Sequence, residues 1–275
     1  MAPFLPRARP TSLAACTSSS AHEVGIRRPV PGIIVAAALL LAACGGTPVA
    51  TTSPAASPTT VNHLTASCSD SSPCVLAAGT WVTAGDNAFI PGLAVTLPDG
   101  WSSHGADHGE LDLIPSDHPH DVIFLWKDVA AIESNGETPQ ILSGVPRTPE
   151  GLTASFRKNP DLVVSTPTET TIASGTRALT YVIGISPSAA YTGRDCPSYP
   201  KCANILKNPD SGSKDFYAIG APEVVRLYLA TVGTATDPHM LVIGLDATDA
   251  VELVRLTAVA APIIASIRLP AVIGN

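Results

Sequence analysis

The stretch Glu223-Val-Val-Arg-Leu-Tyr-Leu-Ala-Thr-Val232 is rich in β-branched and large apolar residues, and His239-Met-Leu-Val-Ile-Gly-Leu245 repeats that composition shortly afterwards. Such runs are typical of β-strands that lie at least partly inside a protein. The segment between them, Gly233-Thr-Ala-Thr-Asp237-Pro238, contains residues that favour turns. The two stretches therefore predict an antiparallel β-hairpin.

Further strands are expected earlier in the chain. Residues 92–97 run into Pro98-Asp99-Gly100, a turn signal, and residues 110–114 and 121–126 follow as two more apolar runs. Residues 162–172 and 177–185 predict a second hairpin that turns about Ser174-Gly175. Most of the domain is thus expected to be antiparallel sheet.

Two helices are predicted between and after these strands. The first has Thr148 as N-cap and Pro149 at its first position, and Asn159-Pro160 ends it. The second begins near Thr248 or Asp249, with Glu252 placed to complete a capping box and Pro262 expected to kink it. Its apolar spacing predicts one buried stripe, formed by Leu253, Leu256, Ala260, Ile263, Ile264 and Ile267.

The order of these elements predicts one α+β domain over residues 63–275, an antiparallel sheet with helices packed on one face. Within it, Pro91-Gly-Leu-Ala-Val-Thr-Leu-Pro-Asp-Gly-Trp101 and the closing Ile264-Ala-Ser-Ile-Arg-Leu269 resemble the PsbP-like α/β/α sandwich family. The resemblance spans about residues 85–270 and extends to lipoproteins of that type in high-GC Gram-positive envelopes. It implies a non-enzymatic accessory or binding module and carries over no functional residues.

The amino-terminal region has the layout of an export signal. Arg27 and Arg28 precede a short apolar core at 33–41, which is too short to span a bilayer. Leu41-Ala-Ala-Cys44 resembles a bacterial lipobox, in which the cysteine receives a diacylglyceryl group before cleavage in front of it. We expect residues 1–43 to be removed and Cys44 to anchor the protein on the extracytoplasmic face of the cell membrane. An ordinary cleaved signal or a buried apolar segment are the alternatives.

The segment that follows is expected to be a tether. Residues 44–62 contain no charged side chain and are rich in Pro, Thr and Ser, which favours an extended, solvated chain. Removal of residues 1–43 leaves 12 basic and 22 acidic residues, a net charge of −10. Nucleic-acid binding relies on Lys and Arg at the phosphates, so this balance argues against a nucleic-acid partner.

The remaining cysteines predict two local disulfides. Cys68 and Cys74 have the same spacing as Cys196 and Cys202, and an even set of cysteines suits an exported chain. Pairing within each of the two short loops is our first expectation. A zinc site of four thiolates is the alternative, although zinc ligands are usually closer together in sequence.

A histidine-rich region invites a metal hypothesis. Four histidines and, apart from Asp112 inside a predicted strand, four carboxylates fall between residues 104 and 121. A five-residue strand, as predicted at 110–114, spans about 17 Å, so the residues at its start and those beyond its end are too far apart for one ion. We therefore expect two polar loops and no metal or other cofactor. The eight residues are His104, Asp107, His108, Glu110, Asp117, His118, His120 and Asp121.

No catalytic signature stands out. Ser211 and Lys214 match Ser-x-x-Lys, but the partner motifs of penicillin-binding proteins are absent, and a loop is expected there. Trp81, Trp101 and Trp126 are expected in the core rather than around a ligand. The sequence thus favours a lipid-anchored envelope protein that binds an envelope protein or an apolar or glycan ligand. A surface hydrolase with a site peculiar to its fold is the alternative.

Overall fold

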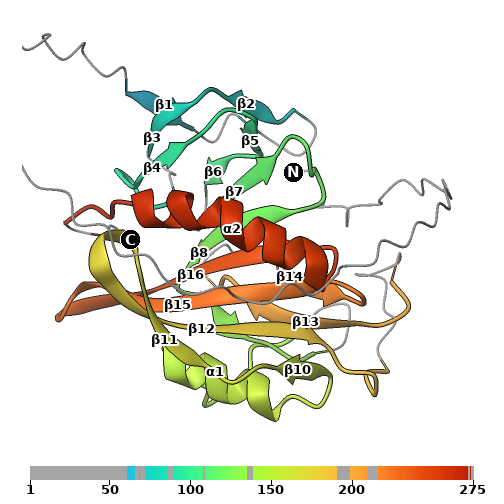
Figure 1. The fold of residues 1–275 in the computed structure, drawn as a ribbon. Coiled ribbons are helices and arrows are strands. Elements are labelled where there is room, and N and C mark those ends of the chain that lie inside the picture. Colours follow the sequence, from blue (N-terminus) through green and yellow to red (C-terminus); the bar gives the residue numbers. More distant parts are fainter. Residues whose placement is uncertain are drawn as a thin grey trace, which may run out of the picture. The chain divides into compact units, whose positions relative to one another are not determined.

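The structure is a computed structural model that describes residues 61–65, 68, 72–85, 89–107, 109–134, 139–190, 199–209, 216–271 and 273. A large antiparallel sheet runs through the middle of this part of the chain (Figure 1). In spatial order its strands are β10 (Leu162–Val164), β12 (Thr176–Ile185), β15 (Val224–Thr234), β16 (Asp237–Ala247), β8 (Val122–Lys127), β7 (Glu110–Pro115), β5 (Trp101–Ser103) and β2 (Cys74–Leu76). The short strands β11 (Thr168–Ile172) and β6 (Ala106–Asp107) pair with β12 and β7.

The central strands are buried on both faces. In β8, Ile123 and Leu125 belong to one apolar core, whereas Phe124 and Trp126 belong to a second core on the opposite face. This alternation follows from the period of two along a strand, which sends neighbouring side chains to opposite sides. The uninterrupted apolar sequences of β8 and β16 therefore reflect a sheet that is covered on each side.

One face of the sheet is covered by α2 (Ala250–Ser266) and by a three-stranded sheet. That smaller sheet contains β1 (Asn62–Leu64), β3 (Gly79–Thr83) and β4 (Ala94–Leu97) in this order, with β1 and β3 parallel. The end of α2 is bonded to β4, because the amide of Thr96 donates to Ser266 Oγ at 2.9 Å.

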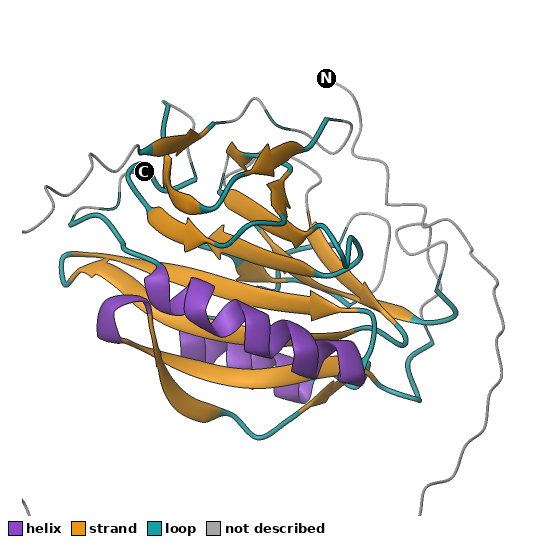
Figure 2. Cartoon of the chain, turned by 45° about the horizontal axis from the view of Figure 1, so that its top comes forward, coloured by secondary structure: helices purple, strands orange, loops and turns teal. Residues whose placement is uncertain are grey.

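The opposite face is covered by α1 (Pro149–Lys158) and by a second three-stranded sheet. Its strands are β9 (Ala130–Ala131), β13 (Cys202–Lys207) and β14 (Phe216–Gly220), with β13 in the middle. The expectation that both helices pack on one face is therefore wrong. Figure 2 shows α2 in front of the central sheet and α1 behind it.

The helix boundaries follow the capping signals. Thr148 Oγ1 accepts from the amide of Gly151 at 3.1 Å, and α1 ends before Asn159. Asp249 caps α2 by accepting from the amides of Val251 and Glu252. The helix continues through Pro262 to Ser266. All of the apolar stripe predicted for α2 is buried, and Ile267 lies just past its last turn.

No described helix is long and apolar enough to cross a membrane.

The predicted hairpins form with local differences. β15 pairs with β16 along their full lengths, and the predicted 177–185 strand is β12. The predicted strand at 162–172 is divided into β10 and β11, which pair with the same partner on either side of residues 165–167. Pro167 has no N–H to donate, which explains an interruption there. The turn between β11 and β12 is the short 3-10 helix η1 (Ala173–Gly175).

The tryptophans have the expected structural role. Trp101 and Trp126 are buried, in the first and second cores respectively. Trp81 is half-buried against the first core, and its Nε1 donates to the carbonyl of Ala77 at 2.9 Å.

Taken together, the described strands and helices make an α+β fold with more strand than helix.

Candidate functional site

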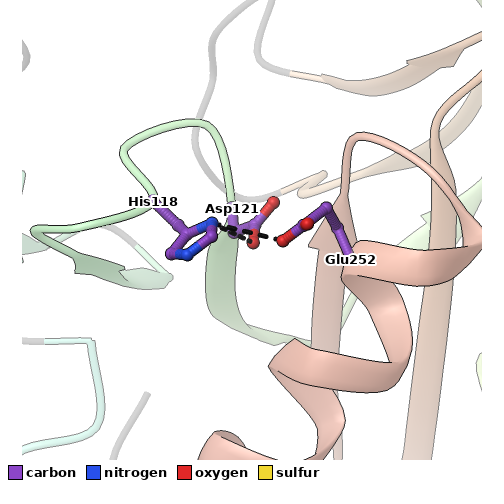
Figure 3. A group of neighbouring side chains, drawn as sticks. All are labelled: His118, Asp121 and Glu252. Atoms are coloured by element: carbon purple, nitrogen blue, oxygen red, sulfur yellow. Dashed lines mark ion pairs between the residues drawn. The ribbon is translucent and has the colours of Figure 1, made fainter. Parts of the chain in front are cut away.

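Three potential ligand side chains meet where the β7–β8 turn contacts the first turn of α2. His118 lies in that turn, Asp121 directly precedes β8, and Glu252 lies in α2 (Figure 3). His118 Nδ1 is 3.2 Å from Glu252 Oε2 and 4.0 Å from Asp121 Oδ2. The turn itself is held by the amide of Asp121, which donates to the carbonyl of His118 at 3.0 Å. One atom of each side chain lies within 4.8 Å of the others, which is compatible with a shared ion.

A fourth residue, Arg255, already joins the two carboxylates. Its Nη2 donates to Asp121 Oδ2, and its Nε donates to Glu252 Oε2 at 2.8 Å. Burial alone would lower the pKa of the Arg255 guanidinium. Hydrogen bonds to Glu252 and Asp121, together with their negative charges, outweigh burial and raise the pKa. Arg255 therefore stays fully charged in this cluster.

The position of Arg255 decides what the cluster can do. The carboxylate oxygens that face His118 are Asp121 Oδ2 and Glu252 Oε2, and both accept from the guanidinium. A metal ion bound to those oxygens would have to displace Arg255. The Asp121 side chain is only 2% exposed, so its charge needs a close partner. The arrangement thus suits an ion-pair cluster that fastens α2 to the β7–β8 turn better than it suits a metal centre.

Of the eight histidines and carboxylates singled out in the sequence, this cluster contains only His118 and Asp121. Asp117 lies at its exposed edge, 3.9 Å from His118 Nε2. His104 and Glu110 lie in the β5–β6 loop and at the start of β7, His120 is exposed in the β7–β8 turn, and His108 is outside the described residues. Glu252 and Arg255 were not predicted here, because nothing in the sequence links α2 to a turn more than a hundred residues earlier.

Glu252 also departs from its predicted role in a capping box. In that motif its carboxylate would accept from the amide of Asp249. In the structure the carboxylate instead contacts Arg255 and His118. The cap of α2 therefore depends on Asp249 alone.

A second histidine is held between carboxylates at the end of the β15–β16 hairpin. His239 Nδ1 lies 2.7 Å from Asp128 Oδ2, and His239 Nε2 lies 3.4 Å from Asp237 Oδ2. The His239 side chain is only 6% exposed. A hydrolytic triad needs a nucleophile on the nitrogen that the aspartate does not hold. Here a carboxylate occupies that side, so the pair is a structural contact.

An open groove runs between α2 and the β11–β12 hairpin. It encloses about 390 Å³, within the size range of small-molecule sites. One wall is the apolar side of α2 with Ala261, Ile264 and Ala265, and the other is polar, with Thr170 and Thr171. The remaining lining residues come from η1 and its neighbours and from β15: Ile172, Ala173, Gly175 and Tyr228.

The predicted modification and disulfide residues are partly described. Cys68 and Cys74 form a disulfide with an S–S distance of 2.03 Å. Cys202, at the start of β13, is disulfide-bonded as well. Cys44, Cys196, Ser211 and Lys214 lie outside the described residues, as do the predicted leader and nearly all of the tether.

No protein-family model matches the sequence, and no curated protein is significantly similar to it.

Proposed function

We propose that the chain is an exported lipoprotein, anchored through Cys44 to the extracytoplasmic face of a bacterial membrane, whose domain acts by binding. The support for the anchor is sequence: two arginines, a short apolar core and Leu41-Ala-Ala-Cys44, followed by an uncharged Pro/Thr/Ser-rich segment. The resemblance to PsbP-like domains supports a non-enzymatic module. The layered α+β arrangement, with helices on both sides of an antiparallel sheet, is compatible with such a sandwich.

The groove beside α2 carries the binding proposal. Its apolar wall suits a hydrocarbon or the face of a sugar ring. Opposite, Thr170 lies on the same side of β11 as the buried Ile172 and offers a hydroxyl group that both donates and accepts. The side chains that line it carry no charge. We infer that it takes an uncharged ligand with apolar and hydroxyl-bearing parts, of the glycolipid or glycan class.

The groove can be tested separately from the anchor. Thr170→Trp places a large ring in the groove, whereas Thr231→Trp adds the same ring at an exposed position of β15 that does not line it. Cross-linked complexes from intact envelopes would be purified with each variant, and lipids and proteins identified by mass spectrometry. We expect Thr170→Trp to lose a specific ligand that Thr231→Trp retains. Equal recovery with both variants would contradict binding in the groove.

The anchor is tested by the mass of the amino-terminal peptide. We expect a peptide that begins at Cys44 and carries acyl chains, and we expect Cys44→Ala to abolish both the acylation and the membrane association. An unmodified amino terminus, or membrane association that survives Cys44→Ala, would refute the anchor and leave the groove proposal intact.

A further inference from the structure

The outward face of α2 is an unbroken apolar stripe. Val251 and Val254 are 76% and 72% exposed, and they begin a series that continues at helical spacing to the end of the helix. Positions 251, 254, 258, 261 and 265 recur every three or four residues and therefore lie on one side of an α-helix. All members of the stripe are exposed: Val251, Val254, Ala258, Ala261, Pro262 and Ala265.

This face is unusual for a helix that already covers a sheet. The opposite side of α2 is buried through Leu253, Leu256 and Ala260. A helix on the surface of a protein normally has polar side chains facing the water, whereas a helix that is apolar all round is normally covered all round. The charged residues of α2, Glu252 and Arg255, lie beside the stripe and are engaged in the ion-pair cluster. The stripe thus has the composition of an interface.

We propose that a second copy of this chain covers the stripe, with the two α2 helices antiparallel about a two-fold axis at Ala258. The two valines lie in the first half of the stripe and the alanines in the second. In an antiparallel pair centred on Ala258, Val251 therefore faces the partner's Ala265, and Val254 faces the partner's Pro262. Each valine then lies over an alanine or a proline of the partner, and Ala258 lies over its own counterpart at the centre, where small side chains allow the helices to approach closely.

Charges at the ends of the helix fit the same arrangement. Asp249 caps the start of α2 and is exposed, and Arg268 is exposed just beyond its end. The antiparallel pairing brings Arg268 of one copy beside Asp249 of the other, twice per dimer. A parallel pairing would instead place like charges together, so charge complementarity selects the two-fold arrangement.

A second copy explains the stripe better than a membrane surface does. Helices that lie on bilayers carry Lys and Arg along the polar border of their apolar face. Along the border of this stripe, α2 has one arginine, and that arginine is paired with two carboxylates. A standard protein interface takes about 20–30 residues from each side, whereas the stripe has six. We therefore expect a reversible dimer of modest affinity, in which the partner's valines also border the groove at Ala261 and Ala265.

Sedimentation velocity of the full chain tests the dimer. The chain would carry Cys44→Ser, so that no acyl group drives association. Val254→Arg places a charge in the stripe without harming the helix, since Arg is a good helix former. Val163→Arg is the matched control, because Val163 is 55% exposed on the edge strand β10. We expect a monomer–dimer equilibrium whose dissociation constant rises at least about tenfold with Val254→Arg and less than about twofold with Val163→Arg.

The charge pair gives an independent test of the orientation. Asp249→Asn keeps a good N-cap while removing the charge, and Arg268→Gln removes its proposed partner. If the two residues meet across the dimer, each variant raises the dissociation constant by about threefold, and the double variant is no weaker than either alone. Additive effects would contradict the antiparallel arrangement. A purely monomeric chain, or one that instead binds vesicles of neutral phospholipid through Val254, would overturn the dimer altogether.

Discussion

Gly244 in β16 is directly opposite Phe124 in β8, and a Cβ atom at Gly244 would lie 2.0 Å from Phe124 Cζ. The missing side chain lets the phenylalanine ring lie over the backbone of Gly244. There its centroid is 4.5 Å from that of Tyr217, a residue of β14 in the covering sheet. The glycine thus makes room for the aromatic contacts through which the second core is closed.

We expect Gly244→Ala to destabilise the fold by about 1–3 kcal/mol, because the new methyl group forces the Phe124 ring out of its position. Gly184→Ala is the matched control. It also adds a methyl group in a central strand, but its nearest neighbour, Val224 Cγ1, is at an ordinary 3.4 Å. Urea unfolding followed by circular dichroism measures both variants. Equal stabilities would show that the ring can move at no cost.

The ion-pair cluster leads to a second prediction. Arg255→Met would leave the Asp121 carboxylate, 2% exposed, without its guanidinium partner. Loss of one member of a buried pair costs about 3–5 kcal/mol, and the partial exposure of Arg255 reduces our expectation to about 2 kcal/mol. Removing the charge as well, in Asp121→Asn/Arg255→Met, should recover part of this loss in urea unfolding.

The matched control for Arg255→Met is Arg177→Met. Arg177 pairs with Glu169 at 2.6 Å, but both side chains are more than two-thirds exposed. Pairs of that kind contribute about 0–1 kcal/mol. A loss from Arg255→Met that is no larger than that from Arg177→Met would contradict the role of the cluster in fastening α2.

The features that were predicted correctly are those determined by residues close together in the sequence, such as turns, helix caps and apolar spacing. The turn residues at 233–238 gave the central hairpin, and Thr148 and Asp249 gave the two helix starts. The spacing of apolar residues identified the buried side of α2. It could not identify which face of the sheet each helix covers, because β8 and β16 are apolar on both faces. The two helices were therefore wrongly expected on the same face.

The features that the sequence did not predict depend on contacts between residues that are far apart in the chain. Strands such as β6 and β9 contain two residues each, too few for any periodic pattern. The ion-pair cluster joins Asp121 to α2 across more than a hundred residues, so the histidine-rich sequence revealed only its first half. The groove likewise forms only when β11, β15 and α2 come together.

Two tyrosines whose hydroxyl groups are buried, Tyr181 and Tyr217, lead to a prediction that the protein loses stability at alkaline pH. Burial raises the pKa of the Tyr181 hydroxyl, and the Thr153 hydroxyl offsets this only in part. Burial also raises the pKa of Tyr217, and the carboxylates of Asp246 and Glu223 raise it further. In the unfolded chain tyrosine ionises near pH 10. Above that pH the unfolded state loses protons that the folded state keeps, so the free energy of unfolding falls as pH rises.

Each tyrosine should contribute about 1.4 kcal/mol per pH unit to this fall above pH 10. We expect Tyr181→Phe and Tyr217→Phe each to make the slope above pH 10 shallower by that amount in urea unfolding measured from about pH 8 to about pH 11. Below pH 9 the slope should be the same in all three proteins, which serves as the internal control. An unchanged slope above pH 10 would mean that the hydroxyl already ionises in the folded state.

The last prediction concerns Asp128, which has a φ of 52°, in the left-handed region that few residues other than glycine adopt. Its side chain compensates for that conformation: Oδ1 accepts from the amide of Met240 at 2.9 Å, and Oδ2 lies 2.7 Å from His239 Nδ1. Asp128→Ala removes both contacts and keeps the strain, so we expect a loss of about 2–3 kcal/mol in urea unfolding. Asp128→Asn should lose less than about 1 kcal/mol, because asparagine tolerates this backbone and still accepts from Met240. Asp237→Ala removes the exposed carboxylate on the other side of His239 and should change stability by less than about 0.5 kcal/mol. A larger loss from Asp237→Ala than from Asp128→Ala would mean that Asp237, and not Asp128, holds His239 in place.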